Sequence, residues 1–120
     1  MGSFDYFVGF EKEPENLDEF LNGCGYDRIP EEIEGTDRNY EPREGGLVEL
    51  TYFSKSLDVK EGEVPDWKKA GFKVTSELMI STKDLDVAEE ASRLAREIIR
   101  KFNGVLYDST SGDYLRAENL

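Results

Sequence analysis

Histidine is absent from this chain of 120 residues, and cysteine occurs once, at Cys24. The lack of histidine removes the commonest general base and the commonest zinc ligand. A single cysteine can form no disulfide within the chain and suits a reducing compartment. With so few soft ligands, we expect no metal site and no cofactor.

Long apolar runs are also missing, and the first residues lack the basic and apolar pattern of a secretory signal. We therefore expect a cytoplasmic protein with no membrane association. Apolar residues make up only 38% of the chain, but they include 7 Phe, 6 Tyr and 1 Trp. This bulk is sufficient for one core, so residues 1–120 are expected to form a single domain.

Acidic residues exceed basic ones by 27 to 15, which gives a net charge of -12. The excess is concentrated in residues 1–46, which hold 13 acidic and 4 basic residues. Such a surface disfavours nucleic acid and anionic membranes, and it speeds the encounter with a basic partner. Plain solubility is the alternative explanation, because uneven charge alone does not mark a site.

Alternation of apolar side chains with a period of two predicts three long strands, at residues 4–10, 47–59 and 72–81. A fourth, short strand is predicted at residues 105–107. The second and third strands follow one another along the chain, so we expect them to pair as an antiparallel hairpin.

The clearest helix of the sequence covers residues 87–102, with apolar residues at spacings of three and four. Asp86 and Glu89 have the spacing of a capping box at its start. Gly104 is expected to end it in the left-handed conformation. A shorter helix is predicted from Pro14 to Gly23.

The resulting order, β-α-β-β-α-β, resembles the ferredoxin-like α+β sandwich, in which two helices cover one face of a four-stranded antiparallel sheet. Right-handed crossovers would place the first and third strands in the centre. This architecture hosts many functions, so it does not identify one. The predicted core residues are Tyr6, Val8, Leu50, Leu78, Ile80, Leu94, Ile98 and Phe102.

Two further features have simple structural interpretations. Residues 108–113 lack the glycine and glutamate positions of a calcium loop, and they read as a turn in which Asp108 bonds the local backbone and Gly112 has a positive φ. Cys24 reads as a small apolar residue at the end of the first helix rather than a nucleophile.

Residues 25–46 show no sustained period and are predicted to be a long loop, a length that is uncommon unless the loop is functional or poorly ordered. Tyr and Arg are frequent binding anchors, and carboxylates could steer a basic partner or act as acid-base groups. The candidate partner-binding residues in this loop are Tyr26, Glu31, Glu32, Glu34, Tyr40, Arg43 and Glu44.

Two hypotheses on function follow. The first is a non-enzymatic binding or regulatory module that recognises a basic protein through its acidic surface. The second is a small enzyme or ligand-binding domain with a Tyr and carboxylate pocket between residues 25–46 and the sheet. Convergence of Asp27, Glu31, Tyr40 and Arg43 on a concave pocket would favour the second hypothesis. The oligomeric state is open, and a dimer through the sheet is one arrangement.

Overall fold

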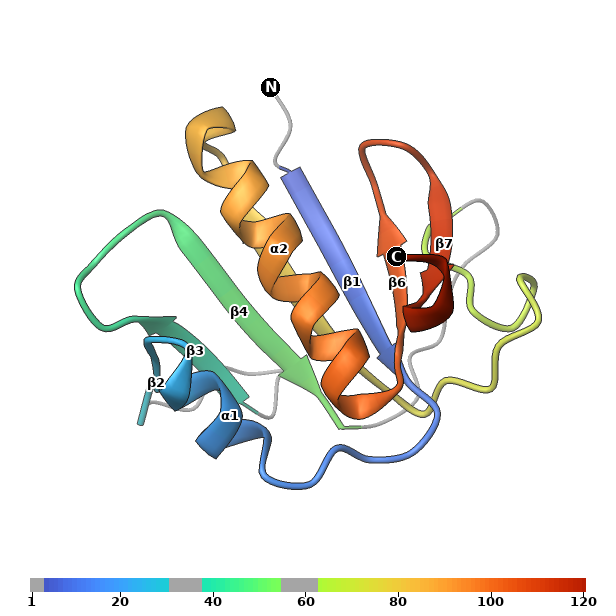
Figure 1. The fold of residues 1–120 in the computed structure, drawn as a ribbon, viewed down its shortest axis with the longest axis horizontal. Helices are drawn as coiled ribbons and strands as arrows, with labels where there is room; N and C mark the ends of the chain where they lie inside the picture. Colours follow the sequence, from blue (N-terminus) through green and yellow to red (C-terminus); the bar gives the residue numbers. More distant parts are fainter. Residues whose placement is uncertain (1–3, 31–37, 55–62) are drawn as a thin grey trace.

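The computed structural model describes residues 4–30, 38–54 and 63–120, which form one antiparallel sheet with two α-helices. The strands are β1 (Phe4–Phe10), β2 (Tyr26–Arg28), β3 (Arg38–Pro42), β4 (Val48–Phe53), β5 (Ser76–Thr82), β6 (Val105–Asp108) and β7 (Asp113–Arg116). The helices are α1 (Leu17–Gly23) and α2 (Leu85–Phe102), and a short 3-10 helix, η1 (Ala117–Asn119), follows β7. The strands lie in the order β2-β3-β4-β5-β1-β6-β7. Figure 1 labels all of them except β5, which passes behind α2.

The predicted four-stranded, ferredoxin-like sheet is wrong, because the described residues form seven strands. The additional strands are β2 and β3, which lie within the predicted long loop, and β7 after β6. Strands of 3 and 5 residues are too short for an alternating pattern to stand out. Pro42 also reads as a strand breaker, but it lies beyond the last residue of β3 that pairs with β4, where its missing N–H costs no bond to that strand.

The predicted antiparallel pairing of the second and third long strands is confirmed by β4 and β5, although both strands differ in extent from the prediction. β5 begins at Ser76 rather than Phe72. Phe72 and Val74 alternate as a strand would, but they pack against Trp67 instead of joining the ladder. Residues 55–59 of the predicted strand lie outside the described part of the chain.

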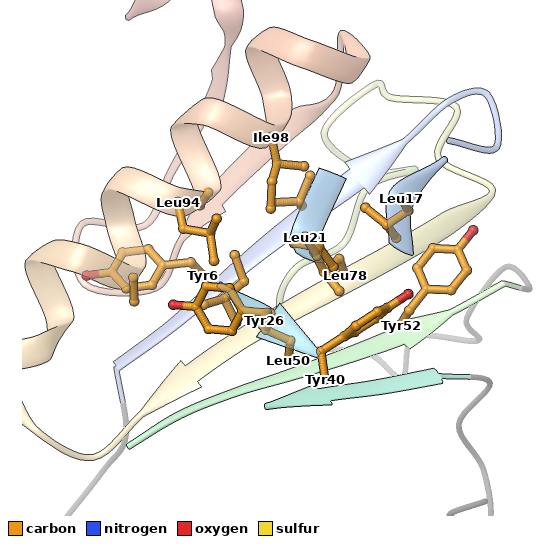
Figure 2. Packing of buried hydrophobic residues seen from close by; sticks show 14 of the residues in the cluster. Tyr6, Leu17, Leu21, Tyr26, Tyr40, Leu50, Tyr52, Leu78, Leu94 and Ile98 are labelled. Carbon is orange, nitrogen blue, oxygen red and sulfur yellow. The ribbon is translucent and has the colours of Figure 1, made fainter. Parts of the chain in front are cut away.

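Both helices cover the same face of the sheet, as predicted, and enclose the main core (Figures 1 and 2). Leu94 and Ile98 of α2 and Leu17 and Leu21 of α1 belong to one cluster with apolar residues from β1 to β6. All predicted core residues are buried except Phe102, which is half-buried at the end of α2.

The ends of α2 differ from the prediction in two ways. The N-cap is Asp84, whose carboxylate accepts a hydrogen bond from the Asp86 amide at 2.9 Å, so the predicted capping box at Asp86 is wrong. At the other end Asn103, not Gly104, has the left-handed conformation, with φ of 55°. Gly104 is needed for another reason, because a Cβ there would lie 2.9 Å from the carbonyl oxygen of Gly9.

The first helix is shorter than predicted. It begins at Leu17 rather than Pro14, directly after Asn16, whose φ of 61° is left-handed and therefore not helical. It ends at Gly23, and Cys24 follows as its C-cap.

The second face of the sheet is covered over β1, β6 and β7 by residues 63–75. Trp67 forms the centre of this cover and packs against a separate cluster of apolar side chains, which contains Phe7, Phe72, Val74, Val105, Tyr107 and Tyr114. Gly9 makes this approach possible, because a Cβ at that position would lie 2.7 Å from Val74 and 3.1 Å from the Trp67 ring.

Candidate functional site

A groove of about 490 Å³ lies on the other half of the second face, over β3, β4 and β5. Tyr40 and Leu50 belong to the core beneath the helices, so the alternation of a strand turns their neighbours toward this opposite face. The side chains that define the groove are Ile29, Glu41, Glu49, Thr51, Phe53 and Met79. We refer to this feature as the sheet groove.

The sheet groove combines an apolar floor with an acidic rim. Ile29, Phe53 and Met79 are half-buried and leave apolar surface accessible. Glu41 and Glu49 are exposed, and within residues 4–30, 38–54 and 63–120 neither has a cationic partner. The groove is thus chemically suited to a ligand that carries both apolar and positively charged groups.

A buried carboxyl group on β5 lies next to Phe53 of the sheet groove, although it does not line the groove itself. Glu77 is only 4% exposed and lies across the ladder from Phe53 on one side and from Gly9 on the other. The Trp67 indole N–H donates a hydrogen bond to its Oε1 at 2.8 Å. Burial raises the pKa of Glu77 to about 7, because the hydrogen bond from Trp67, which acts in the opposite direction, is the weaker effect.

No sequence pattern marks Glu77 as a functional residue. In the alternating segment it occupies the polar face of a strand, where a glutamate is ordinarily solvated. One sequence feature does indicate that the second face is covered. Phe7 and Tyr107 are apolar residues that point away from the main core. Two apolar faces in one sheet imply a second layer that buries any polar residue between them.

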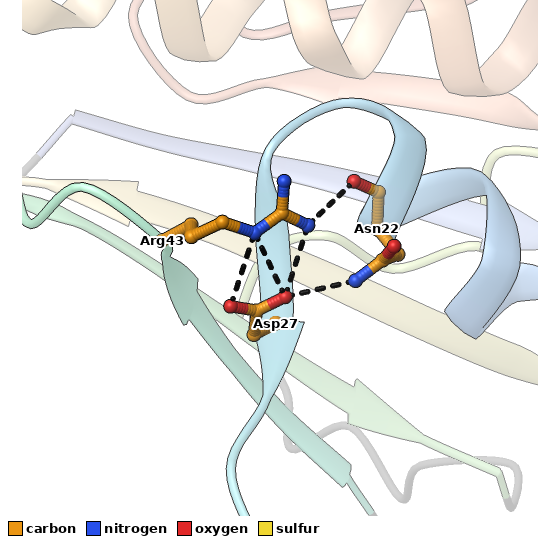
Figure 3. Close-up of polar contacts among 3 residues, drawn as sticks. All are labelled: Asn22, Asp27 and Arg43. Atoms are coloured by element: carbon orange, nitrogen blue, oxygen red, sulfur yellow. Dashed lines mark hydrogen bonds and ion pairs between the residues drawn. The ribbon is translucent and has the colours of Figure 1, made fainter.

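Arg43 is held in an ion pair at the end of the β2-β3 hairpin and does not reach the sheet groove as a free cation (Figure 3). Its Nη2 lies 3.0 Å from Oδ1 of Asp27 and also donates to the carbonyl oxygen of Asn22 at 3.0 Å. The Asn22 side chain donates to the same Asp27 oxygen at 2.8 Å. These bonds connect α1 to the hairpin.

Tyr26 and Tyr40 are core residues, 5% and 1% exposed, with their rings beneath the helices (Figure 2). The Tyr40 hydroxyl donates to Asp18 of α1, which also pairs with Arg28 and Arg38. Burial and the bond to Asp18 raise the pKa of Tyr40 to about 12, so this phenol remains neutral at physiological pH. The cluster around Asp18 therefore anchors α1.

The structure separates the described members of the predicted partner-binding set instead of gathering them on one surface. Tyr26 and Tyr40 are buried, Arg43 is paired with Asp27, and Glu44 is exposed in the turn before β4. The remaining members lie outside the described residues, so their role stays a prediction; they are Glu31, Glu32 and Glu34.

The turn at residues 108–113 and the position of Cys24 at the end of α1 are as predicted. Oδ1 of Asp108 accepts bonds from the amide and hydroxyl of Thr110, and Gly112 has a φ of 76°. Cys24 is half-buried, and burial with the nearby Glu97 carboxylate raises the pKa of its thiol, which disfavours a nucleophilic thiolate.

Comparisons with protein-family models, with curated proteins and with solved structures find no significant match to this chain. Within the described ranges, no three Asp, Glu or Cys side chains are grouped so that they could hold a metal ion. Neither described helix is long and apolar enough to cross a membrane. Among the residues that the structure describes, the sheet groove combines a concave shape, an apolar floor and uncompensated charge, and it is therefore our candidate site.

Proposed function

We propose that this chain is a non-enzymatic cytoplasmic binding or regulatory module that recognises a basic protein through the sheet groove. The observation that carries the proposal is the position of Glu41 and Glu49. Both carboxylates lie at the rim of a concave apolar surface, and no cation among the described residues compensates them. A partner that supplies the cation gains an attraction that the free protein lacks.

The side chains that line the sheet groove favour a role in binding rather than in catalysis. Catalytic side chains must converge on a reacting atom, and the Tyr40 hydroxyl instead turns toward Asp18 on the opposite side of the sheet. Asp27 and Arg43 satisfy each other. What the groove itself presents is shape, apolar area and negative charge, the properties of a recognition surface.

The test requires the partner that co-purifies from native cells. The double variant Glu41→Gln, Glu49→Gln should slow association with this partner several-fold at low ionic strength, and the difference should shrink as salt screens the charges. The matched control is Glu89→Gln, Glu97→Gln, which removes the same charge from exposed positions on α2, across the sheet from the groove. Equal effects of the two pairs on the association rate would contradict the proposal.

A second candidate is a small enzyme or ligand-binding domain. Two observations favour it: the sheet groove has a volume typical of small-molecule pockets, and Glu77, next to Phe53 of the groove, has a pKa suited to proton transfer near neutrality. A metabolite screen by thermal shift separates the candidates. A stabilising metabolite whose effect is lost in Glu77→Gln but kept in the Glu41, Glu49 variant would favour this second function.

A further inference from the structure

We propose that the sheet groove takes an extended segment of the partner in which an apolar residue and a lysine or arginine lie two positions apart. This inference rests on the proposed function and specifies the chemistry of the partner. It is carried by the arrangement of charge and apolar surface along β4.

The acidic rim contains two like charges on neighbouring strands. The last pair of the β3-β4 ladder is Tyr40 with Leu50, and Glu41 and Glu49 are the next residues of the two strands, where both line the sheet groove. Like charges on neighbouring strands repel one another, and no cation of the described residues relieves this repulsion. A cationic side chain between the two carboxylates removes the repulsion and gains two attractions.

Along β4, the apolar floor begins two residues beyond Glu49. Met79 is across from Thr51, two residues from Glu49, and Phe53 continues the floor beyond Thr51. A strand rises about 3.3 Å per residue, so Met79 and the acidic rim are roughly 7 Å apart along β4, whereas Phe53 lies roughly 13 Å from the rim.

An extended ligand has the same repeat. Side chains two positions apart point to the same side of an extended segment, also roughly 7 Å from each other. An apolar side chain seated on Met79 therefore places the side chain two positions away at Glu41 and Glu49. Adjacent residues of an extended ligand point to opposite sides, so they cannot contact both the apolar floor and the acidic rim.

The probe is a capped peptide of Gly and Ser that carries one Phe and, two positions on, one Lys. The protein contains two methionines, Met1 and Met79, so selective methyl labelling gives a direct NMR signal from the groove floor. We expect the Met79 methyl resonance to shift saturably with peptide. Peptides with Lys replaced by Glu, with Phe replaced by Ser, or with Phe and Lys adjacent should bind about tenfold more weakly or not at all.

The charge contact is tested by pairing variants of both molecules. Glu49→Gln should weaken the Lys peptide but leave unchanged a peptide with Ser in place of Lys, whereas Glu89→Gln on α2 should affect neither. Equal affinities for the spaced and adjacent peptides would overturn the inference. So would an unshifted Met79 methyl at peptide concentrations up to millimolar, or a shift that depends on protein concentration without peptide, which would identify a second copy as the occupant.

The two proposals fail in distinguishable ways. If the co-purified partner still depends on Glu41 and Glu49 while no peptide shifts Met79, the extended segment is wrong and the binding module stands. If the association rate of the partner is unchanged by substitution of Glu41 and Glu49, the proposed function itself is wrong.

Discussion

At the scale of single residues, Glu77 and Trp67 show how one hydrogen bond permits a carboxyl group in an apolar layer. An unpaired buried carboxylate would be strongly unfavourable, and the indole N–H provides a partner for either protonation state. Burial remains the larger effect, and it favours the protonated form, so the pKa lies at about 7. The folded protein consequently holds a proton there at a pH where the unfolded chain has released it.

This linkage predicts a pH dependence of stability. The unfolded pKa is near 4.5 and the folded value about 7, so the stabilising contribution is complete below the lower value and is lost as the pH rises through the higher one. The stability of the native protein relative to Glu77→Gln should fall on the order of 3 kcal/mol across this interval, since one pKa unit corresponds to about 1.4 kcal/mol. Glutamine retains an acceptor for Trp67 and does not titrate.

Urea unfolding of both proteins on either side of the interval measures this difference. The comparison with the variant cancels the titration of the other carboxylates. A stability difference that is constant with pH would show that Glu77 is ionised in the folded protein throughout the interval.

The tyrosines of the predicted site illustrate what residue type alone can and cannot indicate. Tyrosine is frequent at interfaces, which favours Tyr26 and Tyr40 as binding anchors, yet the same amphipathic ring packs well in a core when its hydroxyl has a hydrogen-bond partner. Asp18 is that partner for Tyr40, and it comes from another element, 22 positions earlier in the chain. Side-chain pairings of this kind are set by the fold and have no local sequence pattern.

At the scale of elements, the start of α2 depends on which of two aspartates caps it. Asp84 accepts the Asp86 amide bond, whereas Asp86 lies in the first helical turn and interacts favourably with the helix dipole. Asp84→Ala should therefore cost about 0.5–2 kcal/mol of unfolding free energy, because it leaves that amide without its acceptor. Chemical denaturation measures the cost.

Asp86→Ala is the matched control for this prediction, since it removes the same charge two positions away without removing the cap. Its cost should be smaller, about 0.3–1 kcal/mol from the dipole term. An Asp86 variant less stable than the Asp84 variant would restore the capping box predicted from the sequence.

The sequence predicted the long elements of this fold and the short elements α1 and β6, but it missed the strands β2, β3 and β7. The helix at residues 85–102 and the strands β1, β4 and β5 each extend far enough for a repeat of 3.6 or 2 residues to be recognised. β2 has three residues and is fixed by its pairing with β3 and by the Asp27–Arg43 contact. Such strands depend on tertiary pairing rather than on a local pattern, so a ferredoxin-like sheet was predicted in place of the wider one.

At the scale of the whole molecule, the sheet groove exists because the second face is covered on one side only among the described residues. Its floor could not be predicted, since Phe53 and Met79 are far apart in the sequence and meet only through the β4-β5 register. Its charge could be predicted in outline. Glu41 belongs to residues 1–46, the acidic N-terminal segment that the composition indicates. The predicted partner-binding set, however, contains other glutamates of this segment and not Glu41.

The acidic segment of residues 1–46 permits a prediction on long-range electrostatics that is independent of the sheet groove. Replacing Glu31, Glu32, Glu34 and Glu44 with Gln reduces a net charge of -12 and should slightly raise the unfolding free energy at low salt, because it relieves self-repulsion. If these residues also steer a basic partner, the same variant should associate several-fold more slowly at low ionic strength, with dissociation nearly unchanged. Association rates at two ionic strengths measure the effect, and a rate unaltered by both salt and substitution would leave solubility as the role of this charge.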